Sequence, residues 1–193
     1  MSITLEELEK NQKKTESELE NTKQNLAATE HVLVEVKKRL SIVEDIEEIK
    51  QLHIRYFNAL AGLGTLEDAV DCFTENATAD VFPVEKIVLN GKVEIANRFH
   101  EAFGDLHPSA DKPLKPPTDA RFIVHPLISV DGDKATGSWI YYHLHSHPRT
   151  FQSLFWIQGI YDVEYARDNG KWKFSYLKWR CRMGAQLGTP PYE

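Results

Sequence analysis

The first sixty-one residues contain neither glycine nor proline, the two residues that most often end a helix. Thr4-Leu-Glu-Glu7 fits a capping box, in which a threonine and a glutamate three residues later satisfy free amides of the first turn. We therefore expect a helix to begin there. A heptad pattern follows, with leucine dominant at one position and threonine or valine at the other: Leu5, Gln12, Leu19, Leu26, Leu33 and Leu40, then Leu8, Thr15, Thr22, Thr29, Val36 and Val43.

This heptad stripe predicts that residues 1–41 form a coiled-coil oligomerisation segment. A lone helix with the stripe would leave six leucines in water, which favours self-association. Three threonines and one glutamine weaken the stripe, so a long solvated helix is the alternative. A second capping box, Ser41-Ile-Val-Glu44, precedes a shifted apolar register that ends at Gly62 and Gly64. We expect a globular domain over residues 42–185 and a flexible tail over residues 186–193.

Residues 121–147 predict two strands joined at Asp131-Gly132-Asp133, and they hold four of the eight histidines. Successive side chains of a strand point to opposite faces, so every second residue shares a face. If the two faces coincide, arginine, histidine and tyrosine side chains look into one space. The residues concerned are Arg121, Ile123, His125 and Leu127 on the first strand, and Trp139, Tyr141, His143, His145 and His147 on the second.

Helical patterns fill the first half of the chain and strand patterns the second. Short helices are expected near residues 66–73 and 93–103, short strands near 77–82 and 87–89, and long strands over 151–165 and 171–183. Residues 104–120 carry four of the nine prolines and predict a long loop. This order predicts an α+β fold, with helices on one face of a curved antiparallel sheet. In the last strand, alternation predicts one shared face for Trp172, Phe174, Tyr176, Lys178, Arg180 and Arg182.

Composition narrows the function classes. The net charge of −6 and the pI near 5.8 argue against a nucleic-acid partner, which usually requires a basic surface. No apolar run approaches the length that spans a membrane, and the N-terminus does not resemble a signal peptide. Cys72 and Cys181 have neither metal-site spacing nor a disulfide framework. We therefore expect a reduced, cytoplasmic protein without nucleic-acid or membrane partners.

Four motifs carry a resemblance to a known family. They are Asp45-Ile-Glu-Glu-Ile-Lys-Gln-Leu with Arg55-Tyr56-Phe57, the segment Cys72-Phe-Thr-Glu-Asn-Ala77, the hairpin around Asp131-Gly-Asp133, and Tyr161-Asp-Val-Glu-Tyr165 with Gly170-Lys-Trp172. Together they resemble the nuclear transport factor 2-like superfamily, and within it the polyketide cyclase (SnoaL-like) and bile acid 7α-dehydratase group. The resemblance covers residues 42–185 and implies a cone-shaped pocket between sheet and helices, without metal or organic cofactor.

The resemblance also implies where acid–base residues should lie. In family dehydratases an aspartate follows the helix tyrosine by five residues, and a histidine in the strand before the Asp-Gly-Asp turn acts as the base. The tyrosine matches Tyr56, but the aspartate position falls on Ala61 and a common histidine position on Arg121. This chain therefore departs from the family pattern at both members of the pair.

His143 is the leading candidate for the base, because histidine has a pKa near neutrality and this position aligns with an acidic site position of the dehydratase group. A three-residue turn at residues 131–133 would place Arg121 directly opposite His143, whereas a two-residue turn would shift the pairing to Tyr142. The sequence leaves both open. Arg121 beside His143 would favour the neutral imidazole that a base requires. A cross-strand polar pair without a catalytic role is the alternative.

The remaining candidates have weaker signals. His125 precedes a proline and is therefore expected in an extended conformation, either facing the pocket or as a structural, hydrogen-bonded histidine. Tyr56 could donate to a substrate oxygen. The catalytic candidates are thus His143, Tyr56, Arg121 and His125, and the substrate-binding candidates are Asp80, Tyr141, His145, Trp156 and Arg180. A metal site at His143, His145 and His147 is a minor alternative, since residues two apart on one strand face lie too far apart to share one zinc ion easily.

These observations predict a cofactor-independent lyase or isomerase, dehydratase- or cyclase-like, acting by acid–base chemistry on a small cyclic or aromatic molecule. The alternative is a non-catalytic ligand-binding or assembly module on the same fold, because Ala61 and Arg121 occupy the family's acid–base positions. In either case we expect a homo-oligomer, formed through the sheet, the N-terminal helix or both.

Overall fold

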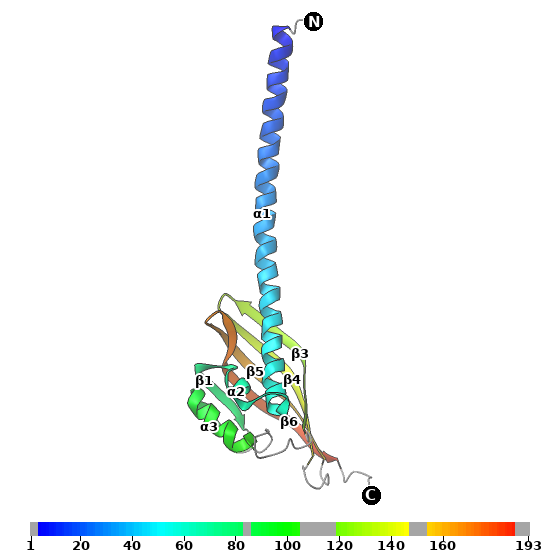
Figure 1. The fold of residues 1–193 in the computed structure, drawn as a ribbon. Helices are drawn as coiled ribbons and strands as arrows, with labels where there is room; N and C mark the ends of the chain where they lie inside the picture. Colours follow the sequence, from blue (N-terminus) through cyan, green and yellow to red (C-terminus); the bar gives the residue numbers. More distant parts are fainter. Residues whose placement is uncertain (1–3, 83–85, 105–118, 147–153, 188–193) are drawn as a thin grey trace. The chain divides into compact units, whose positions relative to one another are not determined.

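A computed structural model describes residues 4–82, 86–104, 119–146 and 154–187. The chain divides into two compact units between Glu44 and Asp45. Helix α1 (Leu5–Asn58) begins in the first unit and ends in the second (Figure 1). The predicted capping box is present, because Glu7 accepts from the Thr4 amide at 3.0 Å while its own amide donates to the Thr4 hydroxyl at 3.4 Å. The predicted second capping box lies inside this continuous helix and starts no new one.

The second unit is built on a six-stranded sheet in the order β2-β1-β6-β5-β4-β3. Its strands are β1 (Phe73–Phe82), β2 (Ile87–Asn90), β3 (Asp119–Asp131), β4 (Lys134–Ser146), β5 (Leu154–Asp168) and β6 (Lys171–Leu187). All neighbours are antiparallel except β1 and β6, which run parallel. The sheet is therefore mixed, and the expectation of a purely antiparallel sheet was wrong at this one pair.

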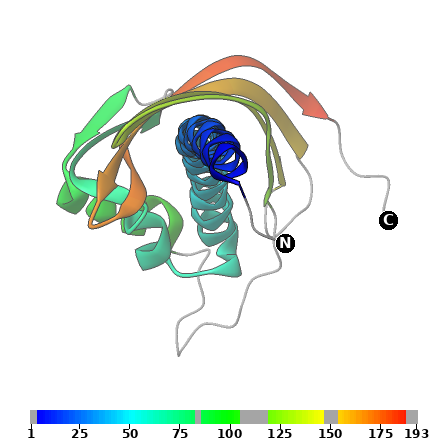
Figure 2. The same ribbon diagram turned by 90° about the horizontal axis from the view of Figure 1, so that it is seen from above.

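The helices of this unit are the end of α1, a π-helix η1 (Ala59–Leu63), α2 (Leu66–Val70) and α3 (Lys92–Phe103). Gly62 has φ +80° within η1, a conformation that glycine adopts without strain, and the helix ends soon after it. Figure 2 shows the sheet curving around the part of α1 that belongs to this unit, with α2 and α3 beside it. The predicted α+β fold, with helices on one face of a curved sheet, is confirmed.

An acidic side chain fastens α1 to the last two strands. Asp45 is buried. It accepts a hydrogen bond from the Trp172 indole at 3.0 Å and forms an ion pair with Arg167. The Arg167 guanidinium also lies over the Trp172 ring, 4.7 Å from its centroid. A buried carboxylate needs such charged and polar partners, so Asp45 fixes where the helix enters the core.

A histidine lies deeper in the same core. His53 is fully buried, and its Nε2 lies 2.7 Å from the Tyr165 hydroxyl, which also accepts from the Trp139 indole at 2.8 Å. The His53 ring packs 4.3 Å from Trp139 and 4.9 Å from Phe174, centroid to centroid. Burial lowers the pKa of His53 to about 3, so the imidazole is neutral at physiological pH.

Candidate active site

Arg121 and His143 lie directly opposite each other on β3 and β4. The sequence left the pairing open between His143 and Tyr142, and the structure selects His143 although the turn has only the two residues Gly132 and Asp133. This turn alone would set Arg121 opposite Leu144. A bulge between Val124 and Leu127 inserts one residue into β3 and shifts the register back by one. Opposed residues of an antiparallel pair have Cβ atoms about 5 Å apart, which brings the guanidinium and the imidazole onto one face.

The bulge also explains why His125 is not beside them. His125 has φ +52° rather than the extended conformation that the following proline predicts, and it is exposed. Pro126 lacks an amide and fits a bulge on β3, which is an edge strand. Beyond the bulge the even-numbered residues Ile128 and Val130 point inward and pack on the core, whereas Leu127 is exposed. The prediction that His125 and Leu127 share the face of Arg121 was wrong.

Aromatic rings surround the Arg121–His143 pair. Tyr141 is buried on the same face as His143, with ring centroids 6.0 Å apart, and it stacks on Phe57 of α1 at 5.4 Å. It also meets Tyr161 edge-on at 5.0 Å. The Arg121 guanidinium lies 5.4 Å from the centre of the Phe103 ring at the end of α3. The cluster therefore collects side chains from α1, α3, β3, β4 and β5 on the concave side of the sheet.

Two phenols of this cluster are strongly perturbed. Burial raises the pKa of Tyr56 and of Tyr161 well above the ordinary value, and the positive charge of Arg121 only partly opposes this effect. Both phenols therefore keep their proton throughout the physiological range, so each can donate a hydrogen bond but neither can act as a base. Both rings contact Phe57, with centroids 5.0 Å away for Tyr56 and 5.5 Å away for Tyr161.

The structure does not bring three of the predicted substrate-binding residues to this cluster. Asp80 forms an ion pair with Lys178 at 2.9 Å. Arg180 donates to Asp162 at 3.1 Å, and its strand neighbour Trp179 faces the core, so Arg180 points away from it. Trp156 contacts Tyr142, with ring centroids 6.0 Å apart, on the side opposite Tyr141. The side chain of His145, and His147 altogether, lie outside the described residues.

A second register shift explains the position of Arg180. Between Glu164 and Tyr165 the pairing of β5 with β6 slips by one residue, at Ser175. Trp172 and Phe174 are buried before the slip, and Leu177 is buried after it. The inward face of β6 therefore changes from even-numbered to odd-numbered residues, and the predicted single face from Trp172 to Arg182 was wrong.

Sequence reasoning missed Tyr161, Phe57, Phe103 and Trp179 as parts of this cluster. Tyr161 could have been found, because it alternates with Val163 and Tyr165 on β5 and all three are buried. Trp179 could not, because its inward direction depends on the slip at Ser175. Its indole nitrogen is buried and finds no hydrogen-bond partner among the residues that the structure describes.

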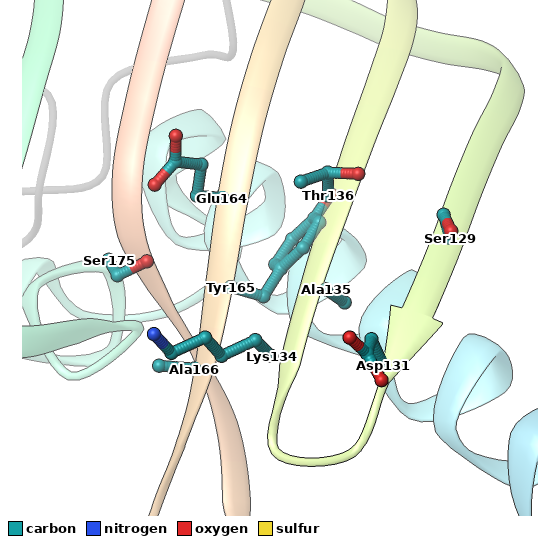
Figure 3. Close-up of a pocket in the computed structure, with 9 residues that line it drawn as sticks. All are labelled: Ser129, Asp131, Lys134, Ala135, Thr136, Glu164, Tyr165, Ala166 and Ser175. Atoms are coloured by element: carbon teal, nitrogen blue, oxygen red, sulfur yellow. The ribbon is translucent and has the colours of Figure 1, made fainter.

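One pocket lined by described residues lies at the other end of the sheet (Figure 3). It has a volume of about 420 Å³ and is lined by Ser129, Asp131, Lys134, Ala135, Thr136, Glu164, Tyr165, Ala166 and Ser175. It contains none of the predicted site residues, and we assign it no ligand. The predicted cone-shaped pocket stays a prediction.

Within the described part of the chain, no three histidine, cysteine, aspartate or glutamate side chains gather closely enough to hold a metal ion. The His145 side chain and His147 lie outside the described residues, so the metal site at the three histidines stays a prediction. Within the same residues, no helix has both the length and the hydrophobicity needed to span a bilayer.

Residues 41–178 match the SnoaL-like domain family. The chain belongs to this family. The SnoaL-like resemblance predicted from the helix, hairpin and Tyr161–Tyr165 motifs is thereby confirmed. A comparison with curated protein sequences finds no match.

Solved structures show the same fold as this SnoaL-like domain. The Kfla4162 protein of Kribbella flavida is 20% identical, with a TM-score of 0.61 over 75% of this chain and 95% of the other. A scytalone dehydratase-like protein of Novosphingobium aromaticivorans is 16% identical, with a TM-score of 0.61 over 79% and 96%. The hexachlorocyclohexane dehydrochlorinase LinA-type3 of Novosphingobium barchaimii is 18% identical, with a TM-score of 0.59 over 80% and 96%.

Proposed function

We propose that this protein is a cofactor-independent lyase or isomerase that removes a proton from carbon in a small cyclic or aromatic molecule. The observation that carries the proposal is the pairing of Arg121 with His143 inside a cluster of buried phenols. Dehydration, dehydrochlorination and isomerisation share this chemistry, since each needs a base and stabilisation of the charge that develops. Fold relatives named as a scytalone dehydratase and a dehydrochlorinase support this reaction class.

The physical chemistry of the cluster suggests a role for each residue. His143 is the base, because histidine is the side chain that most often takes a proton in general base catalysis. Tyr56 and Tyr161 are donors to a developing oxyanion, because their raised pKa keeps them protonated. Arg121 supplies a permanent positive charge beside the same oxygen. Tyr141, which contacts both His143 and Tyr161, positions the substrate ring by stacking.

The assay uses cyclic β-hydroxyketones, whose loss of water creates a conjugated enone that absorbs in the ultraviolet. We expect His143→Gln to lower kcat by about 100-fold or more, the range for loss of a positioned base. Tyr56→Phe should lower kcat by about 100-fold, as for loss of one oxyanion donor. The matched control is Tyr142→Phe, which removes a hydroxyl from the opposite face of the same strand. Turnover that survives both site variants would refute the assignment.

A specific observation favours a second candidate function, a non-catalytic binder of small molecules. Ala61 and Arg121 occupy the positions where the family resemblance implies an aspartate and a histidine, and Ala61 lies within η1. In that case the same compounds should raise the melting temperature without being converted. Arg121→Gln should abolish the shift, while Tyr142→Phe should leave it unchanged.

A further inference from the structure

The leucine and valine side chains of the heptad row are exposed in the N-terminal unit, although they are apolar. Leu19, Leu26 and Leu33 are 54%, 58% and 50% exposed. The same row continues at Leu5, Leu8, Val36, Leu40 and Val43, all of them exposed. A continuous apolar row along one helix is a surface that fits another helix with the same repeat.

The threonines of the row are less polar than their sequence suggests. The hydroxyls of Thr15, Thr22 and Thr29 donate to the carbonyl four residues earlier, at 2.9, 2.7 and 2.8 Å. Because each hydroxyl is satisfied inside its own helix, burying these side chains between helices leaves no unsatisfied donor. The threonines can therefore pack as β-branched residues, much as valine does, which removes the main objection to a coiled coil.

Charges beside the row select the orientation of the partner. With Leu5 at heptad position a and Leu8 at position d, positions e and g begin at Glu9 and Asn11 and flank the row. In a parallel, in-register pair, each g position faces the e position of the next heptad in the neighbouring helix. Two such pairs, Glu18–Lys23 and Arg39–Glu44, join opposite charges. The other three join no like charges, because each contains an uncharged residue: Asn11–Glu16, Asn25–Glu30 and Val32–Lys37. A fully overlapped antiparallel pair joins e with e, which sets Glu9 against Glu44, whereas Glu16–Lys37 and Lys23–Glu30 join opposite charges. The parallel pair therefore has the advantage that none of its contacts joins like charges. The partner that fits is a parallel copy of the same helix.

The residue types also bear on the number of chains. Leucine dominates the a positions and β-branched threonine or valine the d positions, an order that favours three or four strands over two. Val32 at a g position is 60% exposed and widens the apolar face beyond a and d. Gln12 is the single polar residue at an a position, the kind of residue that fixes register.

We propose that residues 5–43 form a parallel, in-register coiled coil of more than two copies of this chain. The test measures the mass of the full-length protein in solution by light scattering and native mass spectrometry. The expected mass is at least three times the chain mass of 22.2 kDa. A monomer or a dimer would overturn the proposal.

Variants separate the heptad row from the rest of the helix surface. The double variant Leu26→Asn and Leu33→Asn should reduce the measured mass. The control Val34→Asn, a neighbouring apolar residue that is 68% exposed but lies off the row, should leave the mass unchanged. Equal masses for the leucine variant and the wild type, or an equal fall in the control, would contradict the role of the row. Thermal unfolding checks that the second unit remains folded in each variant.

A charge swap tests the parallel orientation. Lys23→Glu places a glutamate opposite Glu18 of the neighbouring helix, so we expect the oligomer to dissociate at a concentration about tenfold higher or more. Adding Glu18→Lys restores an opposite-charge pair and should restore the original concentration. Failure of the second change to rescue the first would overturn the parallel register.

Discussion

Stability at acidic pH should depend on His53 more than on any exposed histidine. His53 is fully buried between Trp139 and Phe174, and burial lowers its pKa to about 3. The unfolded chain binds a proton at this residue below its ordinary pKa of about 6.5, whereas the folded chain does not. The contribution of the neutral histidine to stability is therefore complete above pH 6.5 and is lost as the pH falls toward 3.

The size of this effect follows from proton linkage. Between pH 7.5 and pH 5.0, uptake of one proton by the unfolded state alone lowers the free energy of unfolding by about 2 kcal/mol. His53→Gln removes the titrating ring while keeping an acceptor for the Tyr165 hydroxyl. Urea unfolding at both pH values measures the change, at one fixed protein concentration because self-association would make stability depend on it. The wild type should lose about 2 kcal/mol more than this variant.

The control is His31→Gln, which removes an exposed histidine of α1. It should show the same pH dependence as the wild type. The absolute stability of the His53 variant does not enter the comparison, because only the change between the two pH values is compared. If His53→Gln and the wild type lose equal stability on acidification, the imidazole is not held neutral by burial, and the reasoning fails.

Two further predictions concern the framework of the second unit. Asp45→Asn should lower the free energy of unfolding by about 2 kcal/mol, because Arg167 loses its carboxylate partner. Urea unfolding measures this, and the control Glu164→Gln, at an exposed carboxylate of β5, should have little effect. Gly159→Ala should cost about 1–3 kcal/mol and alter tryptophan fluorescence, because the new methyl would meet the Trp179 indole and, at 2.5 Å, the Arg180 carbonyl. Gly104→Ala, with open space around it, should have neither effect.

The fold could be predicted because its signals are local and repeated. The absence of glycine and proline before Gly62 predicts the long helix, and alternation with strong turn residues predicts the four long strands. The parallel pairing of β1 with β6 could not be predicted, because it joins strands that are remote in sequence, and strand periodicity does not say which strands become neighbours.

The candidate site was only partly predictable, because strand alternation holds only between irregularities. Trp139, Tyr141 and His143 share the concave face as predicted, since β4 pairs with β5 without a register shift. Asp80 and Arg180 were predicted to bind substrate, yet each is held by an opposite charge on a neighbouring strand, Lys178 and Asp162. Nothing in the sequence around either residue reveals that partner.

The bulge at His125 and Pro126 decides whether the site can exist at all. From the Asp131–Lys134 pair, an uninterrupted ladder would set Arg121 across from Leu144 and on the same face as the exposed Leu127. The extra residue moves Arg121 to the concave face, opposite His143. The positive φ of His125 is therefore the local conformational cost of turning the Arg121 side chain toward the face that holds Tyr56 and Tyr161. On this reasoning His125 and Pro126 contribute to the proposed chemistry by directing the strand, not by contacting a substrate.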